Sequence, residues 1–100
     1  RNESPFILTG DFNVPDTSEP YKLMAAAFSD AKETSLSGHF GPDGTWSTFE
    51  VCGTTEPRRR IDFIFTSENV IVHDHAILTD SKYGKYPSDH LPVVATVTLP

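Results

Sequence analysis

The sequence predicts an α/β (α+β) protein in which one helix is followed by several strands. A short apolar run at Phe6–Leu8 has the composition of a buried strand. Tyr21, Met24 and Phe28 then recur at helical spacing around a run of alanines, which favours a helix. Beyond the helix, β-branched and aromatic segments alternate with loops rich in glycine, proline or polar residues, as in several further strands.

The N-terminal elements are bounded by clear local signals. Because Phe6–Leu8 is an uninterrupted apolar run, it is expected to form a strand that is buried on both faces. Residues 11–18 are rich in turn formers, so the chain is expected to leave the sheet there. Thr17 or Ser18 is suited to cap the helix, which is expected to continue to Phe28.

The rest of the chain is predicted to consist of strands and loops. The strands are expected at Thr45–Val51, Arg60–Thr66, Val70–Leu78 and Val93–Leu99. The third of these strands is expected to break near His73. Trp46, in the first of them, is expected to lie in the core rather than to contact a ligand.

Length and composition restrict the possible classes of function. One hundred residues correspond to one domain or a piece of one. The net charge of −6 argues against a general electrostatic grip on nucleic acid, which requires clustered Lys and Arg. Cys52 is the single cysteine, so the sequence holds neither an internal disulfide nor a cysteine-based metal site. No run approaches the length of a membrane span, and nothing in the sequence indicates a compartment.

Two polar strings at opposite ends of the chain carry chemistry. In Gly10-Asp11-Phe12-Asn13, an acid and an amide two residues apart in an extended chain point the same way. Asp11 is suited to orient or deprotonate a water molecule, and Asn13 to donate a hydrogen bond to a phosphoryl oxygen. The alternative is an ordinary turn, because Gly-Asp and Asn are common turn formers. In Ser88-Asp89-His90, the imidazole is suited to carry charge toward a phosphate or to shuttle a proton.

A third string places an acid inside an apolar strand. In Ile61–Phe65, Asp62 shares a strand face with Ile64, while the aromatic residues occupy the other face. A carboxylate buried there is costly unless a partner hydrogen-bonds it. The imidazole of His90 and the guanidinium of Arg60 are both candidate partners, and the two interactions are compatible.

Together, and in this order, the three strings resemble the endonuclease/exonuclease/phosphatase superfamily, which includes type I deoxyribonuclease-like nucleases, abasic-site nucleases, inositol-phosphate phosphatases and sphingomyelinases. The resemblance implies a two-sheet β-sandwich flanked by helices, with mostly antiparallel strands in this portion. It also implies that residues 1–100 are the C-terminal portion of a single domain whose N-terminal half is absent. In this family, that half supplies the principal metal-ligating glutamate.

The resemblance also implies roles for individual residues. Asp11, Asn13, Asp62 and His90 match catalytic positions, and Asn13 and His90 match the groups that contact the phosphate. Asp11, Asn13 and Asp89 match positions at or near the metal. Mg²⁺, or Mn²⁺ in its place, is the expected cofactor, since hard oxygen ligands suit it. Which group acts as the general base stays open.

The expected function is metal-dependent hydrolysis of a phosphodiester or phosphomonoester by activated water. The substrate class is open among nucleic acid, inositol phosphates and lipid headgroups, and the acidic charge favours a smaller phosphoester. The chain alone is expected to be inactive. The apolar sheet face that the absent N-terminal half would cover is expected to favour dimerisation of the chain. The alternative is a non-catalytic domain that retains the fold and binds phosphate or protein.

Overall fold

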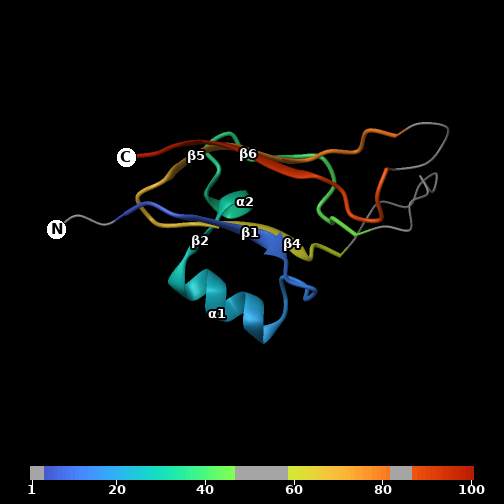
Figure 1. Ribbon diagram of the computed structural model, residues 1–100, viewed down its shortest axis with the longest axis horizontal. Helices are drawn as coiled ribbons and strands as arrows, with labels where there is room; N and C mark the ends of the chain where they lie inside the picture. The colour runs from blue at the N-terminus through green and yellow to red at the C-terminus, as the bar shows by residue number, and fades with distance from the viewer. Residues whose placement is uncertain (1–3, 47–58, 82–86) are drawn as a thin grey trace.

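The computed structural model describes residues 4–46, 59–81 and 87–100, which form two three-stranded sheets packed against each other (Figure 1). In chain order the elements are β1 (Ile7–Asp11), α1 (Glu19–Ala27), β2 (Ser29–Asp30), α2 (Ala31–Thr34), β3 (His39–Phe40), β4 (Asp62–Thr66), β5 (Ile71–Ile77) and β6 (Val93–Thr98). The first sheet has the order β1-β4-β2 and is antiparallel. The second has the order β3-β5-β6, in which β5 is parallel to β3 and antiparallel to β6. The predicted fold class is therefore confirmed.

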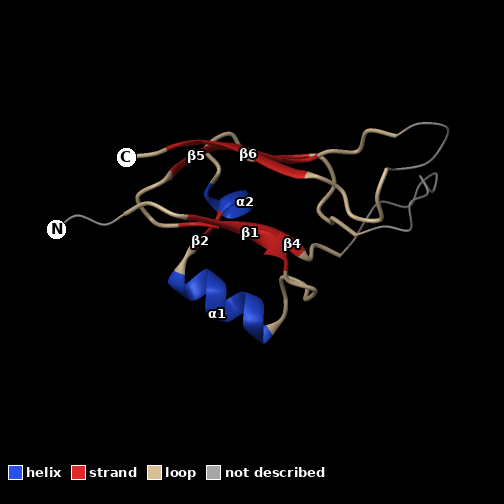
Figure 2. Ribbon diagram, viewed as in Figure 1, coloured by secondary structure: helices blue, strands red, loops and turns tan. Residues whose placement is uncertain are grey.

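The core lies on both faces of β4. Between the two sheets, Ile64 packs with Ala31 of α2 and Val72 of β5. Alternate residues of β6 pack against the same cluster: Val93, Ala95 and Val97. On the opposite face of β4, Phe63 and Phe65 lie against Tyr21 of α1. Helix α1 thus covers the outer face of the first sheet, and α2 lies between the sheets (Figure 2).

Helix α1 begins and ends as its sequence predicts. The Ser18 side chain caps it by accepting a hydrogen bond from the Tyr21 backbone N–H at 3.3 Å. Pro20 lies in the first turn, where its missing N–H leaves no bond unmade. Phe28 closes the helix in an extended conformation, and its ring packs edge-on against Phe6 at 4.9 Å between centroids. These contacts fix the helix across the sheet that carries β1.

Strand β1 is longer than predicted, and it is not buried. It continues to Asp11, so the first acid of the motif belongs to the strand rather than to the following turn. All five residues of β1 are exposed, and the prediction that this strand is buried on both faces is wrong. The physical reason is its position: β1 is the edge of its sheet, and among the described residues β4 alone pairs with it. Phe6, Ile7 and Leu8 are 39%, 45% and 41% exposed.

Several other predictions are refined. The expected break near His73 is a register shift between Val72 and Asp74, so β5 continues through it. Most of the strand expected at Thr45–Val51 lies outside the described residues. Trp46 is at the end of the described part, and at 39% exposure it is not a core residue. The short elements β2, α2 and β3 were not predicted, because two to four residues are too few to show a periodicity.

None of the helices in the described ranges is long and apolar enough to cross a membrane.

Two histidines pair within the second sheet, His75 buried at 1% exposure and His39 half-buried. His39 and His75 are Cα partners in register, and their Nδ1 atoms are 2.8 Å apart. The other ring nitrogen of His39, Nε2, lies 2.7 Å from the Pro42 carbonyl oxygen, so Nε2 must carry a proton. When His39 is neutral, its Nδ1 therefore accepts a hydrogen bond from Nδ1–H of His75. The pair cannot hold a proton on both Nδ1 atoms and keep this bond, so full protonation must break it.

Acid should destabilise the protein through this pair. Burial is the largest influence, followed by the charge of His39, and the pKa of His75 is lowered from 6.5 to about 4. The charges of Arg60 and Lys32 also lower this pKa, whereas the charge of Asp30 raises it. Because the folded-state pKa is lowered, the stability is fully present above pH 6.5 and is lost as the pH falls toward 4. We expect the free energy of unfolding to drop over this window by on the order of 2 kcal/mol through His75.

Urea unfolding measured at successive pH values tests this expectation. In His75→Gln the decline between pH 6.5 and 4 should become shallower. His73→Gln is the matched control, because His73 lies on the same strand but contacts Thr98 instead. An equal decline in the wild-type protein and His75→Gln would contradict the assignment.

Candidate active site

Two acids face each other across the first sheet. Asp11, the last residue of β1, is the Cα partner of Asp62, the first residue of β4. Directly opposite residues of an antiparallel pair project to the same face, so the two carboxylates lie side by side. Like charges in this position are destabilising unless a cation or hydrogen-bond donor compensates them. The local fold therefore creates a demand for positive charge at this end of the sheet.

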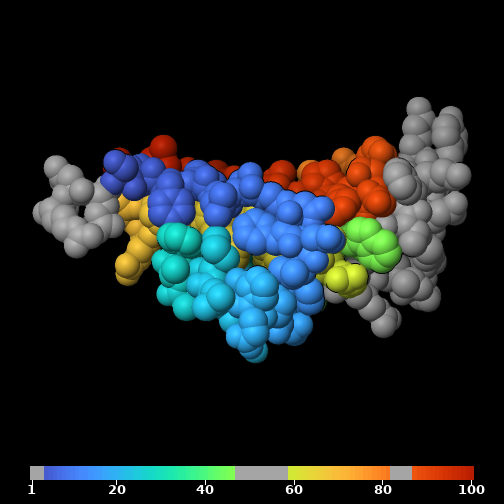
Figure 3. Space-filling model, turned by 60° about the horizontal axis from the view of Figure 1, so that its bottom comes forward, coloured from blue at the N-terminus to red at the C-terminus, as the bar shows by residue number. Residues whose placement is uncertain are grey.

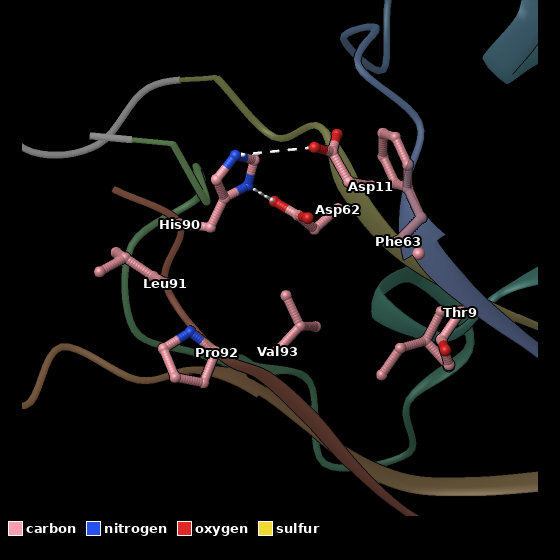
Figure 4. A pocket seen from close by; sticks show the side chains of 10 residues that line it. Thr9, Asp11, Asp62, Phe63, His90, Leu91, Pro92 and Val93 are labelled. Carbon is pink, nitrogen blue, oxygen red and sulfur yellow. Dashed lines mark hydrogen bonds and ion pairs between the residues drawn. The ribbon is translucent and has the colours of Figure 1, made fainter. Parts of the chain in front are cut away.

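His90 compensates part of this negative charge. Its Nδ1 lies 2.7 Å from Oδ2 of Asp62, and its Nε2 lies 3.6 Å from Oδ2 of Asp11 (Figure 4). The Asp62 contact is a hydrogen bond in which Nδ1–H donates to the carboxylate, whereas 3.6 Å is too long for one. Asp62 thus fixes the ring of His90 so that Nε2 points toward Asp11. The predicted pairing of Asp62 with His90 is present in the structure.

The acids also bias the protonation state of His90. The hydrogen bond to Asp62 is the largest influence and raises the pKa of His90 above its ordinary value of 6.5. The negative charges of Asp62, Asp11 and Asp89 act in the same direction, and partial burial opposes them. In the protonated ring both nitrogens are donors, so Nε2–H is available to an anion in front of Asp11.

Thr45 holds the segments of Asp62 and His90 together, and the sequence analysis did not find it. Its fully buried hydroxyl accepts hydrogen bonds from the backbone N–H groups of Ile61 and Asp62, at 3.1 and 3.2 Å. Its carbonyl accepts one from the N–H of Leu91 at 2.7 Å. Thr45 therefore fixes the start of β4 relative to the residue after His90. The available signal was a threonine at the start of a predicted strand, which is too common to single out.

Asn13 is not placed as its spacing suggested. It has a φ of 54°, a left-handed conformation, so Asp11 and Asn13 are not two residues of one extended chain. The N–H of Asn13 donates to Oδ1 of Asp11 at 2.8 Å, which is the side-chain-to-backbone turn that was the alternative reading. The residue is exposed and follows the strand that carries Asp11. Its side-chain role toward a phosphate or a metal stays a prediction.

Asp89 lies beside the site without joining its tight cluster. Its charge contributes to the raised pKa of His90, the next residue. Among the described residues, the metal-ligand atoms that approach one another within 4.8 Å belong to Asp11, Asp62 and His90. The expected metal role of Asp89 therefore stays a prediction.

Arg60 does not pair with Asp62, which corrects the second partner suggested for that acid. Its two terminal nitrogens instead bind the carboxylate of Asp30, at 3.1 and 2.7 Å. The guanidinium also lies over the ring of Phe63, 4.7 Å from its centroid. Arg60 is held on the side of β4 that faces α1, so Asp62 forms its hydrogen bond with His90 instead.

A cleft of about 400 Å³ opens at this group. Its polar wall is formed by Asp11, Asp62 and His90 (Figure 4). The remaining lining comes from the ends of β1 and β4 and from the segment leading into β6: Thr9, Gly10, Phe63, Ile64, Leu91, Pro92 and Val93. This size is at the small end of ligand sites, so the cleft suits a phosphate with a small attached group.

The donor set fits a hard divalent cation. Oδ1 of Asp11 is occupied by the Asn13 N–H, while the contact of its Oδ2 within the described ranges is the 3.6 Å approach of His90. Oδ2 of Asp62 is occupied by His90. Because Mg²⁺ binds through one or two carboxylates and keeps several waters, Asp11 is the residue of this cluster best placed to hold it. Asp62, by contrast, serves to position the imidazole.

Comparisons with a family model and with solved structures point to the same protein family. Residues 1–90 match the model of the Endonuclease/Exonuclease/phosphatase family. A functionally unknown conserved protein from Enterococcus faecalis is 36% identical, with a TM-score of 0.83 over 96% of this chain and 37% of its own. A mannosyl-6-phosphatase from Bacteroides thetaiotaomicron is 31% identical, with a TM-score of 0.84 over 95% of this chain and 38% of its own. No curated protein sequence matches.

A further solved structure extends the agreement to nearly every residue. An endonuclease/exonuclease/phosphatase family protein from Bacteroides thetaiotaomicron is 29% identical, with a TM-score of 0.86 over 99% of this chain. This chain spans 38% of that protein, as it does of the mannosyl-6-phosphatase. The matched residues include β1 with Asp11, β4 with Asp62, and the segment before β6 that contains His90. The chain therefore belongs to the endonuclease/exonuclease/phosphatase family.

Proposed function

We propose that the protein that carries this chain is a Mg²⁺- or Mn²⁺-dependent phosphoesterase acting on a small phosphomonoester. The observation that carries the proposal is the arrangement of His90 between Asp62, which orients it, and Asp11, which faces it across the cleft. The mannosyl-6-phosphatase among the similar structures, at 31% identity, supports a phosphomonoester of a hydroxylated molecule. The net charge of −6 adds to the preference for a small substrate over nucleic acid.

The residues of the cleft divide the chemistry among them. Protonated His90 donates Nε2–H to a phosphoryl oxygen, and its ring is held in that orientation by Asp62. Asp11 orients a water molecule for attack on phosphorus and holds the divalent cation. When bound, the cation offsets the paired charges of Asp11 and Asp62 and polarises the phosphoryl oxygen. The proposal leaves the choice of general base open.

Phosphate release by the protein that carries this chain, from mannose 6-phosphate, p-nitrophenyl phosphate and bis(p-nitrophenyl) phosphate, tests the function. We expect turnover with Mg²⁺ or Mn²⁺, with the monoesters preferred, complete loss in EDTA, and recovery when the metal is returned. Metal-independent turnover would contradict the cofactor, and preference for the diester would contradict the substrate class. No turnover of any ester, together with no metal binding, would favour the non-catalytic alternative.

We also propose that the 100 residues alone are inactive, because they span 38% of the length of the similar solved structures and the resemblance assigns the principal metal-ligating glutamate to the remainder. The same assay on the isolated chain checks this point. Strong metal-dependent turnover by the chain alone would show that the described residues are sufficient.

A further inference from the structure

An exposed aromatic residue stands directly beside the imidazole. Trp46 and His90 are antiparallel bridge partners, and the neighbouring bond from the Leu91 N–H to the Thr45 carbonyl is 2.7 Å long. That bond marks Trp46 and His90 as a non-hydrogen-bonded pair, the kind in which opposite side chains lie closest. Directly opposite residues project to one face, so the indole lies on the same side as the imidazole. Trp46 is 39% exposed, unusual for the sole tryptophan of the sequence.

Arg59 is a cationic residue on the other side of Trp46, so that Arg59, Trp46 and His90 form a row of bridge partners. Arg59 is the second antiparallel bridge partner of Trp46, and its carbonyl accepts the Trp46 N–H at 3.0 Å. The Thr45 N–H donates to the same carbonyl at 2.8 Å, so two residues oppose Arg59 as in a β-bulge, and the bridge to Trp46 places Arg59 next to the indole position in the chain pairing. Arg59 is exposed, whereas its neighbour Arg60 is buried in an ion pair. In the space-filling view, the green surface that ends at residue 46 lies between the yellow surface near residue 59 and the orange surface of residues 87–92 (Figure 3).

We infer that Trp46 and Arg59 form a subsite for the leaving group of the substrate, an inference that rests on the proposed phosphoesterase function. The cleft at Asp11, Asp62 and His90 takes the phosphate, and the group attached to it extends along the row toward Trp46. The flat face of an indole binds the apolar C–H face of a ring. The guanidinium of Arg59 offers donors to hydroxyl oxygens at the far edge of that ring.

The chemistry of the row selects a sugar ring as the leaving group. A six-membered sugar combines an apolar ring face with peripheral hydroxyls, which matches an indole followed by a donor-only side chain. A nucleobase also stacks on an indole, but a polynucleotide requires clustered cations along its backbone, and the chain has a net charge of −6. The inferred substrate class is a phosphate monoester of a six-membered sugar. Trp46 acts as a specificity residue, while His90 and Asp11 act on the phosphate.

Two primary alkyl phosphates that differ in the ring test the inference. In the protein that carries this chain, Trp46→Ala should lower kcat/KM for mannose 6-phosphate about tenfold, mainly through KM, and for glycerol 3-phosphate by a much smaller factor. Trp46→Phe should retain most of the activity on the hexose ester. Phe40→Ala is the matched control, because Phe40 is an exposed aromatic residue whose register partner is Ala76 of β5 rather than a residue of the cleft, and it should leave both substrates unaffected. Equal losses on the two esters in Trp46→Ala would overturn the inference.

A binding measurement separates this inference from the proposed function. In EDTA, where hydrolysis is not expected, Trp46 emission is taken as the difference between the protein and its Trp46→Phe variant. It should change when mannose 6-phosphate is added and stay constant with glycerol 3-phosphate. Constant emission with both esters would overturn the subsite even in an active phosphatase. A change with the hexose ester alone would support the subsite even if no ester were hydrolysed.

Discussion

In the proposed phosphoesterase, the protein that carries this chain, replacing His90 by alanine should lower kcat/KM by about 10³-fold, the range expected for losing a group that exchanges a proton or hydrogen bond with the reacting centre. Nε2 of His90 is the donor at the cleft, 3.6 Å from the carboxylate of Asp11. Its side chain is 30% exposed, so its removal leaves no sealed cavity and should change the melting temperature little. Steady-state kinetics at saturating metal, together with a thermal melt, provide the measurement.

Asp62 should act through His90, and a double-mutant cycle can show it. Alone, Asp62→Asn should cost about 10- to 100-fold, because it disturbs the 2.7 Å bond that orients the ring. In the His90→Ala background the same change should cost almost nothing, since the group that it positions is gone. Asp80→Asn, at an exposed acid outside the cleft lining, is the control and should retain full activity. Additive losses from Asp62 and His90 would mean that Asp62 has a separate role.

The pairing of Asp62 with His90 could be predicted only as one of two options. A carboxylate at the start of an apolar strand needs a hydrogen-bond donor, and of the two partners suggested, His90 and Arg60, the structure shows His90. The helix after Ser18 was predictable because the capping residue, the proline and the alanines all favour it. The helix is determined by local interactions, and the pairing of the carboxylate follows from the free-energy cost of removing it from water.

The wrong predictions concern features that depend on where a residue lies in the tertiary structure. The apolar run before Asp11 looks like a buried strand, but β1 is at a sheet edge, and sequence alone does not reveal the order of strands. The left-handed φ of 54° at Asn13 follows from the turn that its N–H makes with Asp11, and the extended alternative was equally compatible with the residues. Trp46 was assigned to the core because of its place in a predicted strand, whereas it is 39% exposed and forms a bridge to His90.

The partner of Arg60 could not be found from the sequence, because Asp30 lies thirty positions away in a two-residue strand. In the structure Asp30 and Arg60 are both 3% exposed at the side chain and bind each other through two bonds. Burial alone would raise the pKa of Asp30, but the hydrogen bonds from Arg60 and from the Tyr21 hydroxyl, at 2.6 Å, hold it below its ordinary value. This pair joins β2 to Arg60, two residues before β4 begins at Asp62.

Breaking that pair should produce the largest loss of stability in the described part of the chain. Arg60→Met leaves the Asp30 carboxylate buried without its cation, so we expect the free energy of unfolding to fall by about 3–5 kcal/mol. Asp43→Asn, which removes the exposed partner of Lys32, is the matched control and should cost less than about 1 kcal/mol. Urea unfolding at neutral pH measures both changes. A loss below that of the control in Arg60→Met would show that the pair is dispensable.

The double variant Asp30→Ala with Arg60→Met decides what the pair contributes. Asp30 also caps α2 through a 3.1 Å bond from the Lys32 N–H, so its loss carries a further cost of about 1 kcal/mol. We expect most of the free energy of unfolding lost in each single variant to be the cost of burying one charge without its partner. In that case the double variant should lose considerably less free energy of unfolding than the sum of the two single losses. Simple additivity would mean that the two side chains stabilise the fold independently, Arg60 through its stacking on Phe63 and Asp30 through its cap. We expect strong coupling, because each charge is buried with the other as its nearest counter-ion.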